Sequence, residues 1–278
     1  MIYLAAFLLL LLGLYVLMLR GRSGHPGLTA LRGHSYAHRG LHGDSVPENS
    51  LTAFRRAFDH GYGIELDLHL LKDGTIAVMH DSNMERTTGK NQILEELTRE
   101  DLSRFRLGGT QEPVPLFSQV LSLCGGRFPM IIELKTYHGN GDAVSEAACR
   151  MLEDYSGPYC LESFDPKCVR WLKTHHPDLI RGQLSENFLK NDKSRIPAIL
   201  RFAASYHLES FLTRPDFIAH RFSDRKTLSN FLIRKLWRIQ GVSWTIRNRQ
   251  EFDIAVKEGW IPIFEGFLPP ADPSLPKL

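Results

Sequence analysis

Apolar and polar positions follow two different patterns along the chain from residue 35 onward. Apolar side chains recur at helical spacing from Leu51 to Phe58, where Asn49 or Ser50 can cap a helix. Other segments are short apolar runs bounded by turn residues, the pattern of buried strands. We expect strands at 35–37, 64–68, 75–79, 130–134, 159–161, 180–183, 210–212, 242–245 and 262–264, most of them separated by helices.

The order of these elements indicates an α/β fold. Strands that alternate with helices favour a parallel sheet. No glycine-rich nucleotide-binding motif follows the first strand, which argues against an open doubly wound sheet. The pattern therefore favours a closed (β/α)8 TIM barrel.

The first 19 residues, Met1 to Leu19, carry no charge and are almost entirely apolar. At about 1.5 Å per residue they would form a helix about 28 Å long, close to a hydrocarbon core of about 30 Å. The segment therefore predicts one transmembrane helix. No basic residue precedes it, and Arg20 and Arg22 follow it, so we expect an uncleaved anchor rather than a signal peptide.

The residues after this segment indicate an orientation and a compartment. Arg20, Arg22 and Arg32 lie on the C-terminal flank, so the positive-inside tendency places the large domain on the cytoplasmic side of a membrane. The four cysteines show no CxxC spacing, which favours free thiols in a reducing compartment. We therefore expect an anchor at 1–19, a polar linker at 20–34 and a barrel domain at 35–278.

Composition and charge narrow the class of protein. The chain has 278 residues, of which 43% are hydrophobic and 23% charged, and this excludes disordered, collagen-like and coiled-coil classes. The formal net charge is +3 and no basic run recurs, so nothing in the sequence indicates nucleic acid as the partner.

Acidic residues interrupt two of the predicted strands. Glu65 and Asp67 are two positions apart and project to one face of an extended chain, and Glu133 and Lys135 repeat this spacing. They could be surface residues of half-exposed strands. Inside a barrel, however, three converging carboxylates need a cation. Carboxylate oxygens suit Mg²⁺ or Ca²⁺, and the lack of a dense His/Cys cluster argues against zinc.

Two histidines follow predicted strands in polar surroundings. His38 precedes Arg39-Gly40, and His80 precedes Asp81. Active sites of barrels collect at the C-terminal ends of strands, where two imidazoles can act as general base and general acid. Arg39 and Lys135 can bind an anionic group such as phosphate, although a permanent carboxylate-cation network would also explain them.

Nine short motifs lie between residues 37 and 246. They are Ala-His-Arg-Gly at 37–40, Pro-Glu-Asn-Ser at 47–50, Ile-Glu-Leu-Asp at 64–67, Lys-Asp-Gly at 72–74, His-Asp at 80–81, Arg-Thr-Thr-Gly at 86–89, Ile-Glu-Leu-Lys at 132–135, Glu-Ser-Phe-Asp at 162–165 and Val-Ser-Trp-Thr-Ile at 242–246. Taken together, these motifs resemble the glycerophosphodiester phosphodiesterase family, and the apolar segment before His-Arg-Gly resembles its membrane-anchored bacterial branch. The resemblance covers about Tyr36 to Phe267, and the residues at 259–267 depart from the family's usual ending.

This resemblance implies a barrel with a small insertion after the second strand, around 69–109. It also implies roles for individual residues. Glu48 and Asn49 could contact the site, and Trp244 could pack against the glycerol or headgroup or simply within the core. The implied metal ligands are Glu65, Asp67 and Glu133, the implied acid-base pair is His38 and His80, and the implied phosphate-binding groups are Arg39 and Lys135.

The expected reaction is hydrolysis of a glycerophosphodiester to sn-glycerol 3-phosphate and an alcohol, with a divalent metal. The predicted anchor makes lysophospholipids a second substrate class, through a lysophospholipase D activity on the same scaffold. A membrane-tethered binding protein without turnover is the alternative outside the enzymes.

Overall fold

A computed structural model describes residues 1–43, 45–190 and 197–276 of the chain, so the last two residues of the predicted barrel domain lie outside the described part. Strand β1 pairs with both β2 and β9, which closes eight parallel strands into a barrel, while β3 runs antiparallel along β2. The predicted TIM barrel is confirmed. The strands are β1 (Tyr36–Ala37), β2 (Gly63–Leu70), β3 (Ile76–Val78), β4 (Met130–Leu134), β5 (Tyr159–Ser163), β6 (Arg181–Ser185), β7 (Phe217–Arg221), β8 (Gln240–Ile246) and β9 (Trp260–Phe264).

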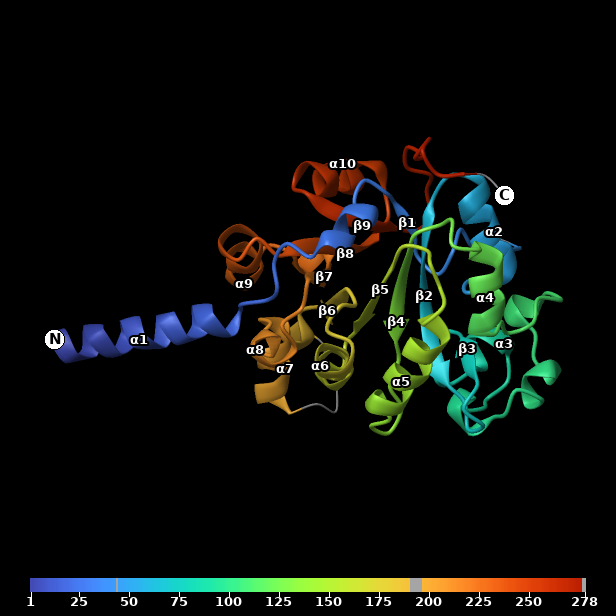
Figure 1. The fold of residues 1–278 in the computed structure, drawn as a ribbon, viewed down its shortest axis with the longest axis horizontal. Coiled ribbons are helices and arrows are strands. Elements are labelled where there is room, and N and C mark those ends of the chain that lie inside the picture. Colours follow the sequence, from blue (N-terminus) through green and yellow to red (C-terminus); the bar gives the residue numbers. More distant parts are fainter. Residues whose placement is uncertain (44, 191–196, 277–278) are drawn as a thin grey trace.

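Helices surround the barrel, and their apolar faces pack on the outward-facing strand residues (Figure 1). In α2, Phe54 and Phe58 are fully buried beside Leu66 of β2. The Ser50 hydroxyl accepts a hydrogen bond from the Ala53 N–H and so caps this helix. The helices are α1 (Ile2–Met18), α2 (Leu51–Asp59), α3 (Glu85–Thr88), α4 (Phe117–Cys124), α5 (Gly141–Leu152), α6 (Pro166–His175), α7 (Ala198–Ser205), α8 (Ser210–Thr213), α9 (Leu228–Phe231) and α10 (Arg249–Lys257).

The segment predicted as a linker, residues 20–34, packs against one end of the barrel. It contains the short 3-10 helix Pro26–Ala30, and Leu28 and Leu31 are buried in the same cluster as inward-facing strand residues such as Ile131 and Phe217. The Tyr36 hydroxyl donates to the Leu31 carbonyl at 2.8 Å. This segment therefore forms the floor of the barrel, at the N-terminal ends of the strands.

The expected insertion after the second strand is present. Between β2 and α4 the chain forms β3, α3 and several 3-10 turns, which enclose a small apolar cluster of their own. Its buried members include Met79, Leu94 and Leu102. The insertion carries His80 to the mouth of the barrel, because the Met79 N–H donates to the Asp67 carbonyl at 3.1 Å.

The predicted strand at 210–212 is wrong. Residues Ser210–Thr213 form the short helix α8, and the strand lies further along the chain, at Phe217–Arg221. Phe211 and Leu212 are exposed, so this apolar pair does not mark a buried strand. Pro215 lies between the two elements and cannot continue a helix.

The predicted transmembrane helix over residues 1–19 is not supported. Helix α1 has 17 residues, a length of about 25 Å at 1.5 Å per residue, and it ends at Met18, just before Leu19, which is completely buried in the domain. Among the described residues, no helix combines the length and apolarity needed to cross a membrane. Figure 1 shows α1 extending away from the barrel, and its side chains from Ile2 to Leu14 are exposed.

The four cysteines are free and buried, as expected for a chain without a disulfide framework. Burial raises the pKa of the Cys124 and Cys149 thiols to about 12, so both stay protonated near neutral pH. The reducing compartment inferred from them remains a prediction.

A buried polar cluster lies outside the barrel mouth, between β7 and the helices that follow β6. His207 and His220 are completely buried, and His207 Nε2 lies 3.1 Å from His220 Nδ1. Burial lowers the pKa of His220 to about 4 and that of His207 well below its ordinary value. Both imidazoles are therefore neutral in the folded protein near pH 7.

This pair makes the free energy of unfolding depend on pH. A histidine whose pKa is lowered in the folded state stabilises the fold at pH values above its pKa in the unfolded chain, about 6.5. As the pH falls below that value, the unfolded chain takes up the proton first. We expect the free energy of unfolding to drop by about 2 kcal/mol from His220 alone between pH 7.5 and pH 5. Urea titrations of the wild type and His220→Gln at both pH values measure this, and an equal loss in the two proteins contradicts it.

Candidate active site

Three buried carboxylates meet inside the barrel. Glu65 and Asp67 lie on β2 and Glu133 on β4, where Asp67 is the register partner of Glu133. Each side chain offers an oxygen such that all three atoms lie within 4.8 Å of one another. The structure thus brings together the three carboxylates that the sequence predicts as metal ligands.

Two cations contact these carboxylates. Lys135 Nζ lies 2.7 Å from Glu133 Oε1 and 3.1 Å from Asp67 Oδ1. Arg39 Nε lies 3.6 Å from Asp67 Oδ2, and the Arg39 backbone N–H donates to Glu65 Oε2 at 3.0 Å. Arg39 has φ of 54°, in the left-handed region that few non-glycine residues adopt, and in this conformation its backbone and side chain both reach the cluster.

Burial and nearby charges shift the pKa values of the three carboxylates in different directions. Burial, with the charges of Asp67 and Glu133, raises the pKa of Glu65 well above its ordinary value. Burial also raises the pKa of Glu133 to about 7, despite the nearby Lys135. For Asp67 the charges of Lys135, His80 and Arg39 together outweigh burial and lower its pKa. One carboxylate is therefore firmly ionised, and its two neighbours need more positive charge to ionise fully.

The donor set fits a hard divalent cation. The three candidate ligands offer oxygen atoms only, the type that Mg²⁺ and Ca²⁺ prefer. Asp67 Oδ1 is buried and lies 3.1 Å from Lys135 Nζ, and because a carboxylate oxygen has two lone pairs, this oxygen can also bind a metal. A bound cation would favour the ionised forms of Glu65 and Glu133. Glu65, Asp67 and Glu133 are thus able to hold Mg²⁺ or Ca²⁺.

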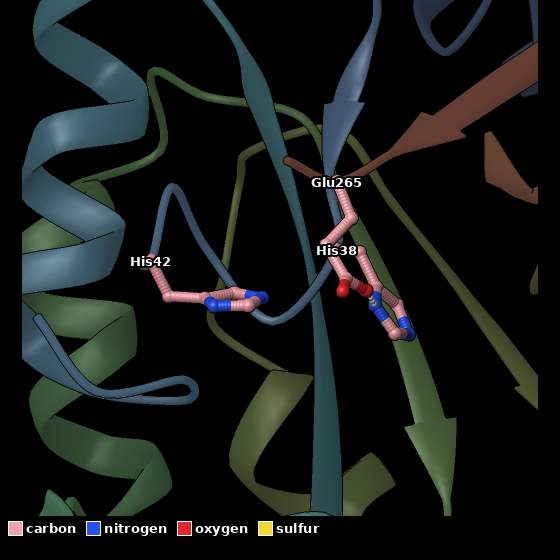
Figure 2. A group of neighbouring side chains, drawn as sticks. All are labelled: His38, His42 and Glu265. Atoms are coloured by element: carbon pink, nitrogen blue, oxygen red, sulfur yellow. Dashed lines mark hydrogen bonds and ion pairs between the residues drawn. The ribbon is translucent and has the colours of Figure 1, made fainter. Parts of the chain in front are cut away.

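His38 lies at the same mouth and is held by a carboxylate from the last strand. Its Nδ1 is 2.6 Å from Glu265 Oε2, and its Nε2 is 4.0 Å from Glu65 Oε2. Ala37 and Phe264 are register partners, so the residues after them are neighbours. Figure 2 shows the Glu265 carboxylate directed at His38, with the His42 ring nearby. Burial lowers the pKa of His38, although the bond to Glu265 opposes this.

The donor atoms of His38, His42 and Glu265 also lie within 4.8 Å of one another. Glu265 Oε2 already bonds His38, however, and this contact fixes the tautomer of the imidazole in the way that a histidine-carboxylate pair does in hydrolases. With a proton on Nδ1, Nε2 faces the carboxylate cluster as an acceptor.

His80, which follows β3, has an equivalent support. Its Nδ1 lies 2.6 Å from Asp81 Oδ1, and Asp81 Oδ2 accepts from Arg86 Nε at 2.5 Å. Arg86 also donates to Glu48, which accepts from Arg39 at 2.9 Å. Burial lowers the pKa of His80, while Asp67 raises it. A chain of charge-assisted hydrogen bonds thus links His80, a predicted acid-base residue, to Arg39, a predicted phosphate-binding residue.

Part of this site lines a cavity of about 310 Å³ at the C-terminal ends of the strands, namely His38, Arg39, Glu65, His80 and Glu133. Trp244 lies in its wall, with its ring 5.6 Å from Phe164 in an edge-to-face arrangement and 5.4 Å from the Arg221 guanidinium. Arg221 also pairs with Glu186 at the rim. Trp244 therefore faces the cavity, and the sequence alternatives of substrate contact and core packing are both compatible with its position.

Two residues of this site were not assigned a role from the sequence. Glu265 could have been noticed because it directly follows the last strand. Glu162 lies on β5 in register with Glu133, and its buried Oε2 accepts no hydrogen bond among the described residues. Asn49 had two expected roles, site contact and helix cap. The structure shows the site contact, since Asn49 donates to Asp67 Oδ2 at 2.8 Å, while Ser50 caps α2.

Comparison with known proteins identifies the same family that the sequence motifs resemble. The Glycerophosphoryl diester phosphodiesterase family model matches residues 38–265. A glycerophosphodiester phosphodiesterase of Caldanaerobacter subterraneus is 32% identical over 158 residues, which are 53% of this chain and 65% of the relative. One from Bacillus altitudinis is 39% identical over 124 residues, 40% of this chain and 50% of the relative. The matched segments thus span half to two thirds of these two relatives.

A solved structure with the same fold is a phosphodiesterase from Oleispira antarctica in complex with the product sn-glycerol-3-phosphate. It superposes with a TM-score of 0.71 at 20% identity, covering 88% of this chain and 95% of that one. The family model covers most of the chain, including the site just described. The chain therefore belongs to the glycerophosphoryl diester phosphodiesterase family.

Proposed function

We propose that this protein is a metal-dependent phosphodiesterase that hydrolyses glycerophosphodiesters to sn-glycerol 3-phosphate and an alcohol. The observation that carries the proposal is the convergence of three buried carboxylates with two imidazoles at one mouth of the barrel. The names of the two relatives and the product bound to the Oleispira protein support the substrate class.

The two histidines transfer protons in this proposal. Both have lowered pKa values, so each is available as a neutral base near pH 7. One accepts the proton of the attacking oxygen, which belongs to water or to a glycerol hydroxyl of the substrate. Attack by the hydroxyl expels the alcohol and gives a cyclic phosphate, which water then opens to sn-glycerol 3-phosphate. The other, in its protonated form, donates to the oxygen of the leaving alcohol.

Arg39 and Lys135 bind the phosphoryl oxygens and stabilise the negative charge that builds on them, an effect of about 3 kcal/mol per well-placed donor. Trp244 contacts the glycerol or the headgroup. A divalent cation held by Glu65, Asp67 and Glu133 would supply positive charge to a non-bridging phosphoryl oxygen and lower the pKa of the attacking oxygen.

Removal of a ligand or of a catalytic imidazole tests the assignment. We expect Glu65→Ala and His38→Ala each to lower turnover of glycerophosphodiesters by about 100-fold or more, since each removes a group that acts on the reacting atoms. Circular dichroism and thermal unfolding check that the domain stays folded. Wild-type turnover in either folded variant contradicts the proposal.

Chelation tests the metal and separates the alternatives. With EDTA we expect turnover of bis(p-nitrophenyl) phosphate and of glycerophosphodiesters to fall to background and to return when Mg²⁺ or Ca²⁺ is added. Release of choline or ethanolamine from an acylated lysophospholipid would instead favour the lysophospholipase D activity. No turnover of any diester, with either metal, would favour the binding protein.

Glu265 is a positioning residue for His38 in this proposal. Glu265→Ala removes the partner of Nδ1 and should lower kcat by about 10-fold to 100-fold, whereas KM should change little because Glu265 lies behind the imidazole. Glu265→Gln keeps a hydrogen-bond acceptor and should restore part of the loss.

Arg247→Gln is the matched control, since Arg247 is exposed and lies 3.7 Å from the same Glu265 oxygen. A loss of kcat in Arg247→Gln as large as in Glu265→Ala, or a change confined to KM, would show that Glu265 does not act through His38.

A further inference from the structure

A second cavity, rich in positive charge, lies where helix α1 joins the barrel. Six basic side chains line it, and no acidic side chain does so among the described residues. Its volume is about 800 Å³, so it is large enough for a phosphate-bearing headgroup. The basic residues are Arg20, Arg22, Lys173, Arg181, Arg214 and Arg238.

The positive charge of this cavity is only partly neutralised. Arg22 forms a bidentate ion pair with the buried Asp216, at 2.5 and 2.7 Å. Arg214 donates to the Arg20 carbonyl, and Lys173 donates to the Leu212 carbonyl, so these bonds orient both cations without cancelling their charge. Burial, together with the charges of Arg181 and Arg214, lowers the pKa of Lys173. A bound anion would offset the repulsion between these like charges.

Apolar surface surrounds the same junction. Helix α1 contacts α8, the Trp237 Nε1–H donates to the Val16 carbonyl at 2.9 Å, and Figure 1 shows α8 and α9 beside the end of α1. Large apolar side chains stay exposed on these short helices and on the π-helix Leu232–Leu236 that directly follows α9. They are Phe211, Leu212, Leu228, Phe231 and Leu236, with 61% of Phe231 accessible.

A basic cavity, an exposed apolar rim and an apolar helix at one end of the domain match the chemistry of an anionic lipid surface. Phosphate groups attract the cations, and the acyl region below them accepts the apolar side chains. We propose that this end of the barrel docks on a lipid surface of negative charge, with a lipid phosphate in the basic cavity and the rim of α8 and α9 in contact with the acyl chains.

The two cavities lie at opposite ends of the same strands. Arg181 begins β6 and lines the basic cavity, whereas Leu184 and Glu186, at the far end of β6, line the catalytic cavity. Arg181 and Glu186 are five residues apart, which is about 16 Å along an extended strand. The catalytic mouth therefore opens away from the docked lipid. This orientation favours water-soluble diesters as substrates over lipids held in that surface, a conclusion that rests on the proposed function.

Vesicle flotation with the full chain tests the docking surface. The probes are vesicles of phosphatidylcholine alone and vesicles with roughly 30% phosphatidylglycerol, at low and high salt. We expect about tenfold or more tighter binding to the anionic vesicles at low salt. The triple variant Lys173→Gln, Arg214→Gln, Arg238→Gln should lose this preference and keep its binding to neutral vesicles.

A second triple variant removes the same number of charges elsewhere. Lys72, Lys90 and Arg99 are exposed on the insertion, on the far side of the barrel from α1 (Figure 1), and their change to Gln should preserve the preference for anionic vesicles. Equal binding of the wild type to both vesicles, or equal losses in the two triple variants, overturns the proposal.

Turnover of a water-soluble glycerophosphodiester separates the two proposals. It should be unchanged in both triple variants, which also reports that they fold. If no protein turns the diester over, the proposed function fails while the vesicle result still stands. Should the first triple variant misfold, Phe231→Ser with Leu236→Ser should weaken binding to both kinds of vesicle, and unchanged binding would contradict the docking surface.

Discussion

The arrangement of the mouth follows from the cost of placing several carboxylates where water is scarce. An unpaired buried carboxylate is costly to ionise, and Glu65, Asp67 and Glu133 are all buried within a few ångströms of one another. Lys135 and Arg39 offset this cost. Arg39 does so from a left-handed backbone conformation, which lets its N–H and its guanidinium serve two different carboxylates.

Local pattern found only part of the centre of this arrangement. Alternation placed Glu65 with Asp67, and Glu133 with Lys135, on one face of each strand, but it left open whether that face points inward, and the resemblance to a family supplied the ligand set. Their convergence further requires the register between β2 and β4, which no short sequence window contains. Glu265 is the clearest omission, since it contacts His38 across 227 positions of the chain and belongs to no motif around it.

The errors lie where apolar residues are not in the core. Phe211 and Leu212 look like part of a strand, yet they are exposed on α8, and the true strand ends in His220 and Arg221, which weaken its apolar signal. The N-terminal segment was judged on its composition, its length and the charges that flank it. Only tertiary structure shows that Leu19 belongs to the domain and that the helix ends one residue earlier.

The floor formed by residues 20–34 determines how molecules leave the enzyme. Leu28, Leu31 and the inward-facing residues around them fill that end of the barrel, so no passage runs along its axis through the described part of the chain. Under the proposed reaction, substrate and both products share one opening. Under that reaction, glycerol phosphate that has not yet diffused away would occupy the space that the next diester needs, and product and substrate would compete for the same mouth.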